Sequence, residues 1–333
     1  MSSSQSRRIA GRSVSAIGLG CMNLSHAYGV PPAESDAQRL LLRALDLGVD
    51  FFDTAALYGF GANEELVGRA LSTHRSRFFL ASKCGMQGVN GVRVIDGRAA
   101  TIKATCEDSL RRLRTDHIDL YYLHRWDKTV AIEESVGAMA DLVREGKIGS
   151  IGLSEVSGAT LRRAHAEHPI AALQSEYSLW TRNPELGALA ACRELGVAFV
   201  AFSPLGRGYL GGSLHDVTAL DAKDIRRSMP RFAPEAYAAN LALLDEAHLI
   251  ASEAQCSLAQ LSLAWLLARG DDIIPIPGTV QIAHLEDDLG AERVALSADH
   301  MARLDALFAH TRIRGERYNA ASMAEVDSEN YAQ

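Results

Sequence analysis

The hydrophobic positions of this chain alternate between short continuous runs and longer stretches with helical spacing. Residues 36–47 carry apolar side chains at helical spacing, and Gly48 follows at the usual place of a C-terminal stop. Compact apolar runs such as 78–83 and 118–124 are typical of strands that are buried on both faces. The pattern predicts an α/β protein in which strands and helices alternate.

Eight such units follow one another along the chain. The predicted strands are 14–19, 51–53, 78–83, 118–124, 148–153, 172–175, 198–202 and 272–276. The predicted helices are 36–47, 63–71, 100–113, 132–145, 157–168, 184–195 and one after the last strand. Successive strand–helix units imply parallel strands with right-handed crossovers, and closing such a sheet gives a (β/α)8 TIM barrel. An open doubly wound sheet would carry Gly-x-Gly-x-x-Gly after its first strand, and residues 18–23 do not complete that pattern.

One connection is unusually long. Residues 206–239 contain no clear strand, and glycines cluster at its start, at Gly206, Gly208, Gly211 and Gly212. Long loops inside compact domains are usually functional, and glycines let the backbone approach a phosphate closely. Because the segment follows the seventh strand on the catalytic face, we expect it to cover a ligand. A decorative insertion is the alternative.

Length and composition are consistent with one large domain. The chain has 333 residues, of which 47% are hydrophobic, enough for a single barrel. We expect one domain over 1–333, with a core of about 8–310 and a polar tail over 315–333. The tail either folds over the mouth of the barrel or hangs loose, and we expect it to be partly ordered.

Charge and cysteine usage exclude several classes of function. The net charge of −7 offers no basic field for nucleic acid, and no apolar run approaches the roughly 18 residues of a membrane span. Residues 1–8 lack the apolar stretch of a secretory signal. The five cysteines are widely spaced, and neither they nor the histidines show metal-ligand spacing. We expect a cytoplasmic protein without metal, nucleic-acid or membrane partner, and no feature indicates an oligomeric state.

Four polar residues stand at or just after predicted strand ends: Asp53, Tyr58, Lys83 and His124. The carboxyl ends of barrel strands meet at one mouth, where an acid, a phenol, an amine and an imidazole would form a proton-transfer centre. Each residue also has an ordinary explanation, namely a helix cap, surface packing, a solvated charge and a structural histidine. Their occurrence at successive barrel positions favours the catalytic interpretation.

The motifs around these residues resemble the aldo-keto reductase superfamily, from about Gly18 to Leu289. The residues that carry the resemblance are 52–59, 81–83, 119–124 and 276–279. The segments 152–155, 176–182, 202–208, and 224–226 with 230–232, are most similar to the branch that contains the plant perakine reductase and its bacterial and yeast relatives.

The resemblance implies NAD(P)H-dependent reduction of a carbonyl group, reversible to oxidation of an alcohol. A free tyrosine has a pKa of about 10, and a nearby ammonium lowers it. We therefore expect Lys83 to lower the pKa of Tyr58, which exchanges the proton, while Asp53 holds Lys83. His124 is expected to bond the substrate oxygen or relay the proton.

The resemblance also implies a coenzyme site along the later strands. Ser154, Glu155 and Gln174 are expected against the nicotinamide amide, and Phe202 beneath the ring. The complete expected set is Gly20, Met22, Asp53, Ser154, Glu155, Gln174, Phe202, Ser203, Pro204, Leu205, Gly206, Gly208, Ile276, Gly278, Thr279, Gln281, His284, Asp287 and Asp288.

The adenosine end departs from the pattern of the family. Relatives usually carry Lys or Arg that binds the 2′-phosphate of NADP(H), but no Lys or Arg lies between Thr279 and Asp288. His284 would serve only in part, because it is mostly neutral at pH 7. The acids at 286–288 would repel the phosphate. NADP(H) is the family expectation, and NAD(H) is a serious rival.

The substrate, a small carbonyl compound or alcohol, is expected above Tyr58 and His124. Trp126 is the predicted substrate contact, although packing beneath its loop would also explain it. Further candidate walls are Met22, Asn23, Met86, Arg125, Trp180 and Tyr209. Arg125 either binds an anionic substrate or is a surface charge. Three functions remain open: a carbonyl reductase, a dehydrogenase that works chiefly in alcohol oxidation, and a non-enzymatic nucleotide-sensing subunit akin to the potassium-channel β-subunits.

Overall fold

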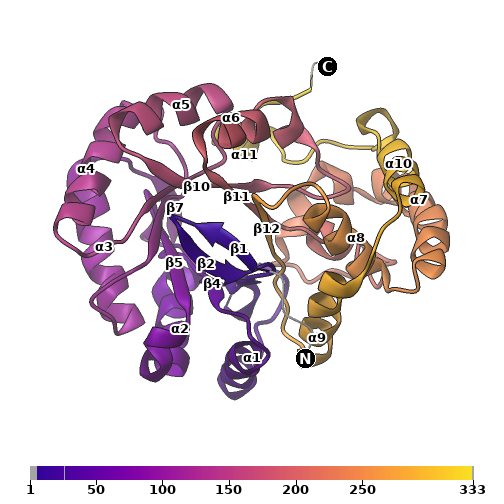
Figure 1. The fold of residues 1–333 in the computed structure, drawn as a ribbon, viewed down its shortest axis with the longest axis horizontal. Coiled ribbons are helices and arrows are strands. Elements are labelled where there is room, and N and C mark those ends of the chain that lie inside the picture. Colours follow the sequence, from indigo (N-terminus) through magenta and orange to yellow (C-terminus); the bar gives the residue numbers. More distant parts are fainter. Residues whose placement is uncertain (1–5, 26, 332–333) are drawn as a thin grey trace.

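The structure, a computed structural model, describes residues 6–25 and 27–331. Its centre is an eight-stranded sheet in the order β12-β11-β10-β9-β8-β5-β4-β3, and every pairing in it is parallel. Backbone hydrogen bonds of 3.0 Å from Gly18 N to Pro275 O and from Gly20 N to Pro277 O bring β12 beside β3. The sheet therefore closes on itself as the predicted barrel, with helices around its outside (Figure 1).

The barrel strands are β3 (Leu19–Gly20), β4 (Phe51–Asp53), β5 (Phe79–Cys84), β8 (Leu120–Leu123), β9 (Ile151–Ser154), β10 (Ile170–Glu176), β11 (Ala198–Phe202) and β12 (Ile273–Ile276). The helices are α1 (Glu34–Asp46), α2 (Ala62–Leu71), α3 (Ala99–Leu113), α4 (Ile132–Arg144), α5 (Gly158–Glu167), α6 (Ala188–Leu195), α7 (Pro234–Glu253), α8 (Leu258–Leu267), α9 (Ile282–Gly290), α10 (Ala298–Leu307) and α11 (Ala320–Ala324). Helices α3, α4, α5, α6 and α8 pack their apolar stripes on the strands, while α10 packs on α7 outside α8 (Figure 1).

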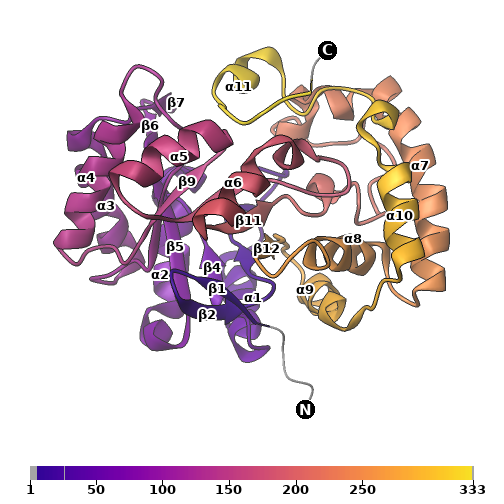
Figure 2. The same ribbon diagram turned by 45° about the horizontal axis from the view of Figure 1, so that its top comes forward.

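The first predicted strand, 14–19, is wrong. Residues in this region form an antiparallel hairpin of β1 (Ser6–Ile9) and β2 (Arg12–Ser15), and only Leu19–Gly20 joins the barrel. Ile9 and Val14 are buried against interior barrel side chains such as Phe51 and Phe79. The hairpin closes one end of the barrel (Figure 2). The expectation about a secretory leader rests largely on residues 1–5, which lie outside the described residues.

A second hairpin, β6 (Met86–Val89) with β7 (Val92–Ile95), follows β5 and was not predicted. Figure 2 shows it, together with α11, at the end of the barrel opposite β1 and β2. The long connection after β11 contains three short 3-10 turns: Gly206–Gly208, Ile225–Ser228 and Pro230–Phe232. Helix α7 then begins at Pro234, so the predicted extent of this loop to 239 was too long.

The polar C-terminal stretch packs on the same end as β6 and β7. The backbone N–H of Asp327 donates to Glu155 O at 2.9 Å, and a Glu329 oxygen accepts from Gly158 N at 2.8 Å. Lys128 adds bonds to the carbonyl oxygens of Ala324 and Val326. These bonds fasten the tail to the ends of β8 and β9. Within the described ranges, no helix is both long and apolar enough to cross a membrane.

Candidate active site

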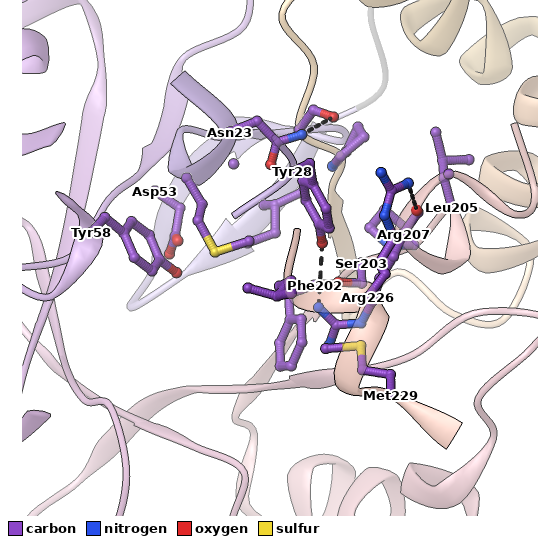
Figure 3. A pocket seen from close by; sticks show the side chains of 18 of the residues that line it. Asn23, Tyr28, Asp53, Tyr58, Phe202, Ser203, Leu205, Arg207, Arg226 and Met229 are labelled. Carbon is purple, nitrogen blue, oxygen red and sulfur yellow. Dashed lines mark hydrogen bonds between the residues drawn. The ribbon is translucent and has the colours of Figure 1, made fainter. Parts of the chain in front are cut away.

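A cavity of about 540 Å³ opens at the carboxyl ends of the barrel strands. Tyr58 and Asp53 lie at one side of it, and Arg207, Arg226 and Leu205 lie at the other (Figure 3). Side chains from β4, β9, β10, β11 and β12 line its walls, together with loop residues. This size and depth are those of a small-molecule site.

Three of the four residues predicted to form the proton-transfer centre, Asp53, Lys83 and Tyr58, are in direct polar contact. Lys83 Nζ forms an ion pair with Asp53, donates to Thr54 O at 2.8 Å and lies 3.2 Å from the Tyr58 hydroxyl. Gln174 Nε2 holds the second Asp53 oxygen at 2.7 Å. Lys83 is fully buried behind Tyr58 and does not line the cavity. The phenol of Tyr58 is thus the polar group through which this buried ion pair reaches the cavity.

The electrostatics of this trio differ in part from the expectation. Burial disfavours the charge of Lys83, but Asp53 and Tyr58 outweigh it and raise the pKa of Lys83, so the ammonium is retained. Burial raises the pKa of Tyr58 by more than Lys83 lowers it, so the expected net lowering is wrong for this state of the protein. Tyr58 is therefore a protonated phenol at neutral pH.

His124 completes the group from the end of β8. Its ring meets the Tyr58 ring edge to face, with centroids 5.8 Å apart. Its Nδ1 is buried without a hydrogen-bond partner in the described part of the chain, which leaves Nε2 as the nitrogen available to the cavity. Burial, and then the charges of Arg125, Lys83 and Arg93, hold the pKa of His124 well below its usual value. The imidazole is therefore neutral.

Most of the predicted coenzyme residues line this one cavity. Those that do are Gly20, Met22, Asp53, Ser154, Gln174, Phe202, Ser203, Pro204, Leu205, Gly208, Ile276, Gly278, Thr279, His284, Asp287 and Asp288. Glu155, Gly206 and Gln281 do not line it. Gly206 turns away at a positive φ of 56° and packs against Trp180, while Gln281 is exposed at the start of α9.

Glu155 instead anchors the C-terminal tail. It accepts two bonds from Arg317, of 2.9 and 2.6 Å, and one from Ser328 at 2.8 Å. Burial works to raise the pKa of Glu155, but Arg317 overcomes this and lowers it to about 2. The expected contact of Glu155 with a nicotinamide amide is therefore not available in this geometry. Sequence reasoning missed Arg317, which lies 162 residues further along the chain.

The adenosine end contains the predicted acids but presents only two of them to the cavity. Glu286 faces outward and pairs with Arg43 at 2.5 Å. Asp287 is held by Ser257 Oγ at 2.6 Å and Gln260 Nε2 at 2.9 Å. Asp288 is buried, and burial together with Asp287 raises its pKa to about 7.

The wall between the two ends includes residues that sequence reasoning did not assign to the site. Arg207, at a positive φ of 58°, pairs with Glu176 at 2.7 Å and donates to the hydroxyls of Tyr28 at 3.3 Å and Tyr318 at 3.2 Å. The Arg226 guanidinium lies over the Tyr28 ring, 5.0 Å from its centroid. The glycines around Arg207 indicated the loop, but no local pattern identified its partners. This loop forms part of the cavity wall, and that it covers a ligand stays a prediction.

The aromatic residues proposed as substrate walls lie elsewhere. Trp126 does not line the cavity; its Nε1 donates to Val130 O at 2.9 Å within its own loop. Trp180 and Tyr209 are buried and stacked on each other with centroids 4.0 Å apart. Of the other candidates, Met22, Asn23, Met86 and Arg125 do line the cavity. Three tail residues, Asn319, Ser322 and Glu325, line it as well.

The lining suits a dinucleotide. Ser154 and Gln174 offer hydroxyl and amide groups beside Tyr58, the half-exposed Phe202 offers an aromatic face, and His284 and Asp288 offer polar groups at the far end. Asp288 is buried and lines the cavity, so its carboxyl group is placed to bond a ligand. In these same ranges, no group of three His, Cys, Asp or Glu residues could hold a metal ion.

Comparison with known proteins agrees with this geometry. Residues 16–309 match the Aldo/keto reductase family. The chain is 42% identical over 311 residues to "Probable aldo-keto reductase 1" of Glycine max, covering 92% of this chain and 89% of that protein. The chain therefore belongs to the aldo-keto reductases, a family of NAD(P)H-dependent carbonyl reductases, and it is an oxidoreductase.

Two solved structures share the fold over nearly their whole length. A glycerol dehydrogenase from Gluconobacter oxydans has a TM-score of 0.85 at 29% identity, with 93% of this chain and 96% of that one covered. An aldo-keto reductase from Bacillus halodurans in its holo form has a TM-score of 0.74 at 27% identity, with 95% and 99% covered.

Proposed function

We propose that this protein reduces aldehydes or ketones to alcohols, reversibly, with Tyr58 as the proton donor. The observation that carries the proposal is the buried Asp53–Lys83 ion pair, whose ammonium lies 3.2 Å from the Tyr58 hydroxyl at the wall of a deep cavity. A structural ion pair would not need a phenol at the cavity surface. Membership of the aldo-keto reductase family supports the same chemistry.

Each side chain has a separate task in this mechanism. A bound nicotinamide coenzyme would supply hydride to the carbonyl carbon. Tyr58 would donate its proton to the carbonyl oxygen, which gains negative charge in the transition state. Lys83 would stabilise the phenolate that remains, and Asp53 keeps Lys83 charged and oriented. Neutral His124 would bond the same oxygen through Nε2. In alcohol oxidation Tyr58 would act as the base.

The coenzyme preference that we propose is relaxed or directed toward NADH. At the adenosine end, the cavity is lined by His284, Asp287 and Asp288, without a lysine or arginine between Thr279 and Asp288 to bind a 2′-phosphate. Carboxylates can instead accept hydrogen bonds from a free ribose hydroxyl. A kcat/KM ratio of a hundredfold or more in favour of NADPH would refute this preference.

Two finer assignments belong with this proposal. The motif matches support a place in the perakine reductase-like branch, and the similarity to a plant aldo-keto reductase agrees with it. We also propose that residues 1–333 act as one domain whose tail covers the mouth of the site. The second candidate function is a dehydrogenase that works chiefly toward oxidation. The cation-free adenosine end favours it, because NAD(H) use suits that direction.

The test is the variant Tyr58→Phe, assayed with 4-nitrobenzaldehyde and either coenzyme. Removing a general acid typically costs about 10²–10⁴ in rate, so kcat should fall by about a thousandfold. Coenzyme binding, followed by quenching of tryptophan fluorescence, should change less than threefold, because the phenol lies at the substrate end of the cavity.

The matched control is Tyr121→Phe on β8. It removes the same hydroxyl from a buried tyrosine that does not line the cavity and whose hydroxyl lies 3.5 Å from Ser109 Oγ. This variant should keep wild-type turnover. Turnover at the wild-type rate in Tyr58→Phe would remove the mechanism.

A further inference from the structure

The arginines that line the cavity differ in how their charge is neutralised. Arg93 pairs with Glu325 at 2.6 Å, Arg207 with Glu176 at 2.7 Å, and Arg226 with Asp224 at 2.6 Å. Arg125 also lines the cavity, but in the described part of the chain it has no carboxylate partner. It is therefore the exception among these four cations.

The bonds that Arg125 does make fix its position. Its Nη1 donates to His124 O at 2.6 Å and to Ser154 Oγ at 3.2 Å. Its Nε and Nη2 have no hydrogen-bond partner within residues 6–25 and 27–331, and the side chain is only half-buried. Nη1 thus fixes the guanidinium beside the reacting centre, and the N–H groups of Nε and Nη2 remain available to a ligand.

The surrounding charges compensate Arg125 only in part, through the attraction of Glu155. At the substrate end, Lys83 is balanced by Asp53, Arg93 is balanced by Glu325, and His124 is neutral. Glu155, the nearby acid behind Ser154, is already bound by two nitrogens of Arg317. The net field beside Tyr58 and His124 is consequently positive, and its source is a planar group that binds oxyanions through two parallel N–H bonds.

We infer that Arg125 recognises an anionic group on the substrate, so that the preferred substrates are aldehydes or ketones that carry a carboxylate or a phosphate. When the carbonyl oxygen lies between Tyr58 and His124, the substrate anion lies against Nε and Nη2 of Arg125. Arg125 directly follows His124 in the chain, just after β8. The pairing orients the carbonyl and is formed only when substrate enters. This inference rests on the proposed carbonyl reduction and names its substrate class.

The experiment compares para-substituted benzaldehydes that differ mainly in charge. 4-Nitrobenzaldehyde is neutral, 4-carboxybenzaldehyde has nearly the same shape with one negative charge, and 4-formylphenyl phosphate carries a phosphate. Steady-state kcat and KM are measured for each with saturating coenzyme, in wild type, Arg125→Gln and Arg125→Lys. For each protein, kcat/KM of a charged substrate is divided by kcat/KM of the neutral substrate. Comparing this ratio between variant and wild type removes the difference in intrinsic reactivity between the substrates.

In Arg125→Gln the ratio for at least one charged substrate should fall by about tenfold or more, mainly through KM, because a charge-assisted pair is lost. The charged substrate whose ratio falls further shows whether Arg125 prefers a carboxylate or a phosphate. Arg125→Lys keeps the positive charge but not the two parallel N–H donors of the guanidinium, so this ratio should fall less than in Arg125→Gln. The control Arg163→Gln removes one positive charge on the exposed face of α5 and should leave every ratio unchanged.

Two outcomes would overturn the inference. If Arg125→Gln slows the neutral and charged substrates equally, Arg125 acts on the reacting centre instead of on a substrate anion. If both ratios stay at their wild-type values while coenzyme binding weakens, Arg125 belongs to the coenzyme site. A wild-type protein that turns over none of the three aldehydes with either coenzyme would instead refute the proposed carbonyl reduction itself.

Discussion

At the scale of single residues, the site depends on how burial changes the behaviour of ordinary groups. Tyr58 is partly buried beside an ammonium, yet desolvation of its phenol dominates and its pKa is raised. For reduction this is favourable, because the phenol remains a proton donor throughout the neutral range. Lys83 then acts mainly after the proton has left, by stabilising the phenolate, and less by promoting ionisation beforehand.

Asp288 provides a residue-scale prediction, because its pKa of about 7 lies inside the assay range. Below pH 7 the carboxyl is neutral, and above pH 7 it is charged and repels a 2′-phosphate that faces the same wall as Asp287. Preference for NADH over NADPH should therefore rise as the pH passes through 7. In Asp288→Asn, kcat/KM with NADPH should increase by roughly tenfold at pH 8 and little at pH 5.5. Parallel pH profiles for the two coenzymes measure this.

The same variant should also change stability with a defined sign. A carboxyl whose pKa is raised from 3.8 to about 7 on folding destabilises the folded state increasingly as pH rises between these values. Asp288→Asn should therefore raise the free energy of unfolding by up to about 4 kcal/mol at pH 8, and by progressively less toward pH 4. Urea titrations give the difference. The exposed Asp299→Asn serves as control and should stay within about 0.5 kcal/mol of wild type.

At the scale of elements, the tail and the loop after β11 are joined to the strand ends by buried ion pairs. Arg317 reaches Glu155 at the end of β9, and Arg207 reaches Glu176 at the end of β10 while also bonding Tyr318 of the tail. Two segments that are far apart in the sequence are therefore held on the mouth through adjacent strands. The wall of the site depends on these pairs as much as on the strands themselves.

Removing one partner of the Glu155–Arg317 pair should be costly. Arg317→Ala leaves a buried carboxylate without its cation, which typically costs about 3–5 kcal/mol of unfolding free energy. Because the pKa of Glu155 is lowered to about 2, the stabilisation is present above its unfolded value of about 4.5 and is lost as pH falls toward 2. The difference in unfolding free energy between wild type and variant should therefore be largest near pH 7 and become smaller as the pH falls.

Arg162→Ala is the matched control, since it breaks an exposed pair with Glu194 and should cost less than about 1 kcal/mol. Thermal or urea unfolding of both variants measures the contrast. A cost for Arg317→Ala as small as that of Arg162→Ala would mean that the tail contributes no stability through this pair.

The elements also show where sequence reasoning succeeded and where it failed. The strand over 198–202 and the helix over 100–113 were predicted to within one residue, because buried runs and helical stripes are local signals. The β6–β7 hairpin was missed because it lies on the rim, with Val92 63% exposed, and Met86 alone among its strand residues is buried, which is too little to produce a pattern. Arg317 was missed because nothing in its neighbourhood indicates that it pairs with Glu155 far along the chain.

At the scale of the whole molecule, the two ends of the barrel have separate roles. The β1–β2 hairpin fills one end with Ile9 and Val14, and the cavity occupies the other (Figure 2). The apolar cluster at the closed end extends along the barrel interior to Ile276 and packs against Phe202, two residues that line the cavity, whereas Ile9 and Val14 themselves do not line it. Stability should therefore respond more strongly than kinetics to changes at the closed end.

Ile9→Ala tests this separation. Ile9 is completely buried, and truncating such a side chain typically costs about 2–5 kcal/mol, so the melting temperature should fall clearly. At 25 °C the KM values for coenzyme and aldehyde should stay within twofold of wild type. Leu249→Ala on α7, where the side chain is 63% exposed, is the control and should leave both quantities unchanged. A large rise in KM with Ile9→Ala would show that the two ends are coupled.

The seam between β3 and β12 also has a consequence for the order of events during synthesis. Its two hydrogen bonds join Gly18 to Pro275 and Gly20 to Pro277, so the barrel cannot close until almost the whole chain has been made. Asp53, Tyr58, Lys83 and His124 have all been translated long before that point. In the interval the edge of β3 has no partner strand from its own chain, and an unpaired edge is the part of a nascent protein most exposed to pairing with a neighbour.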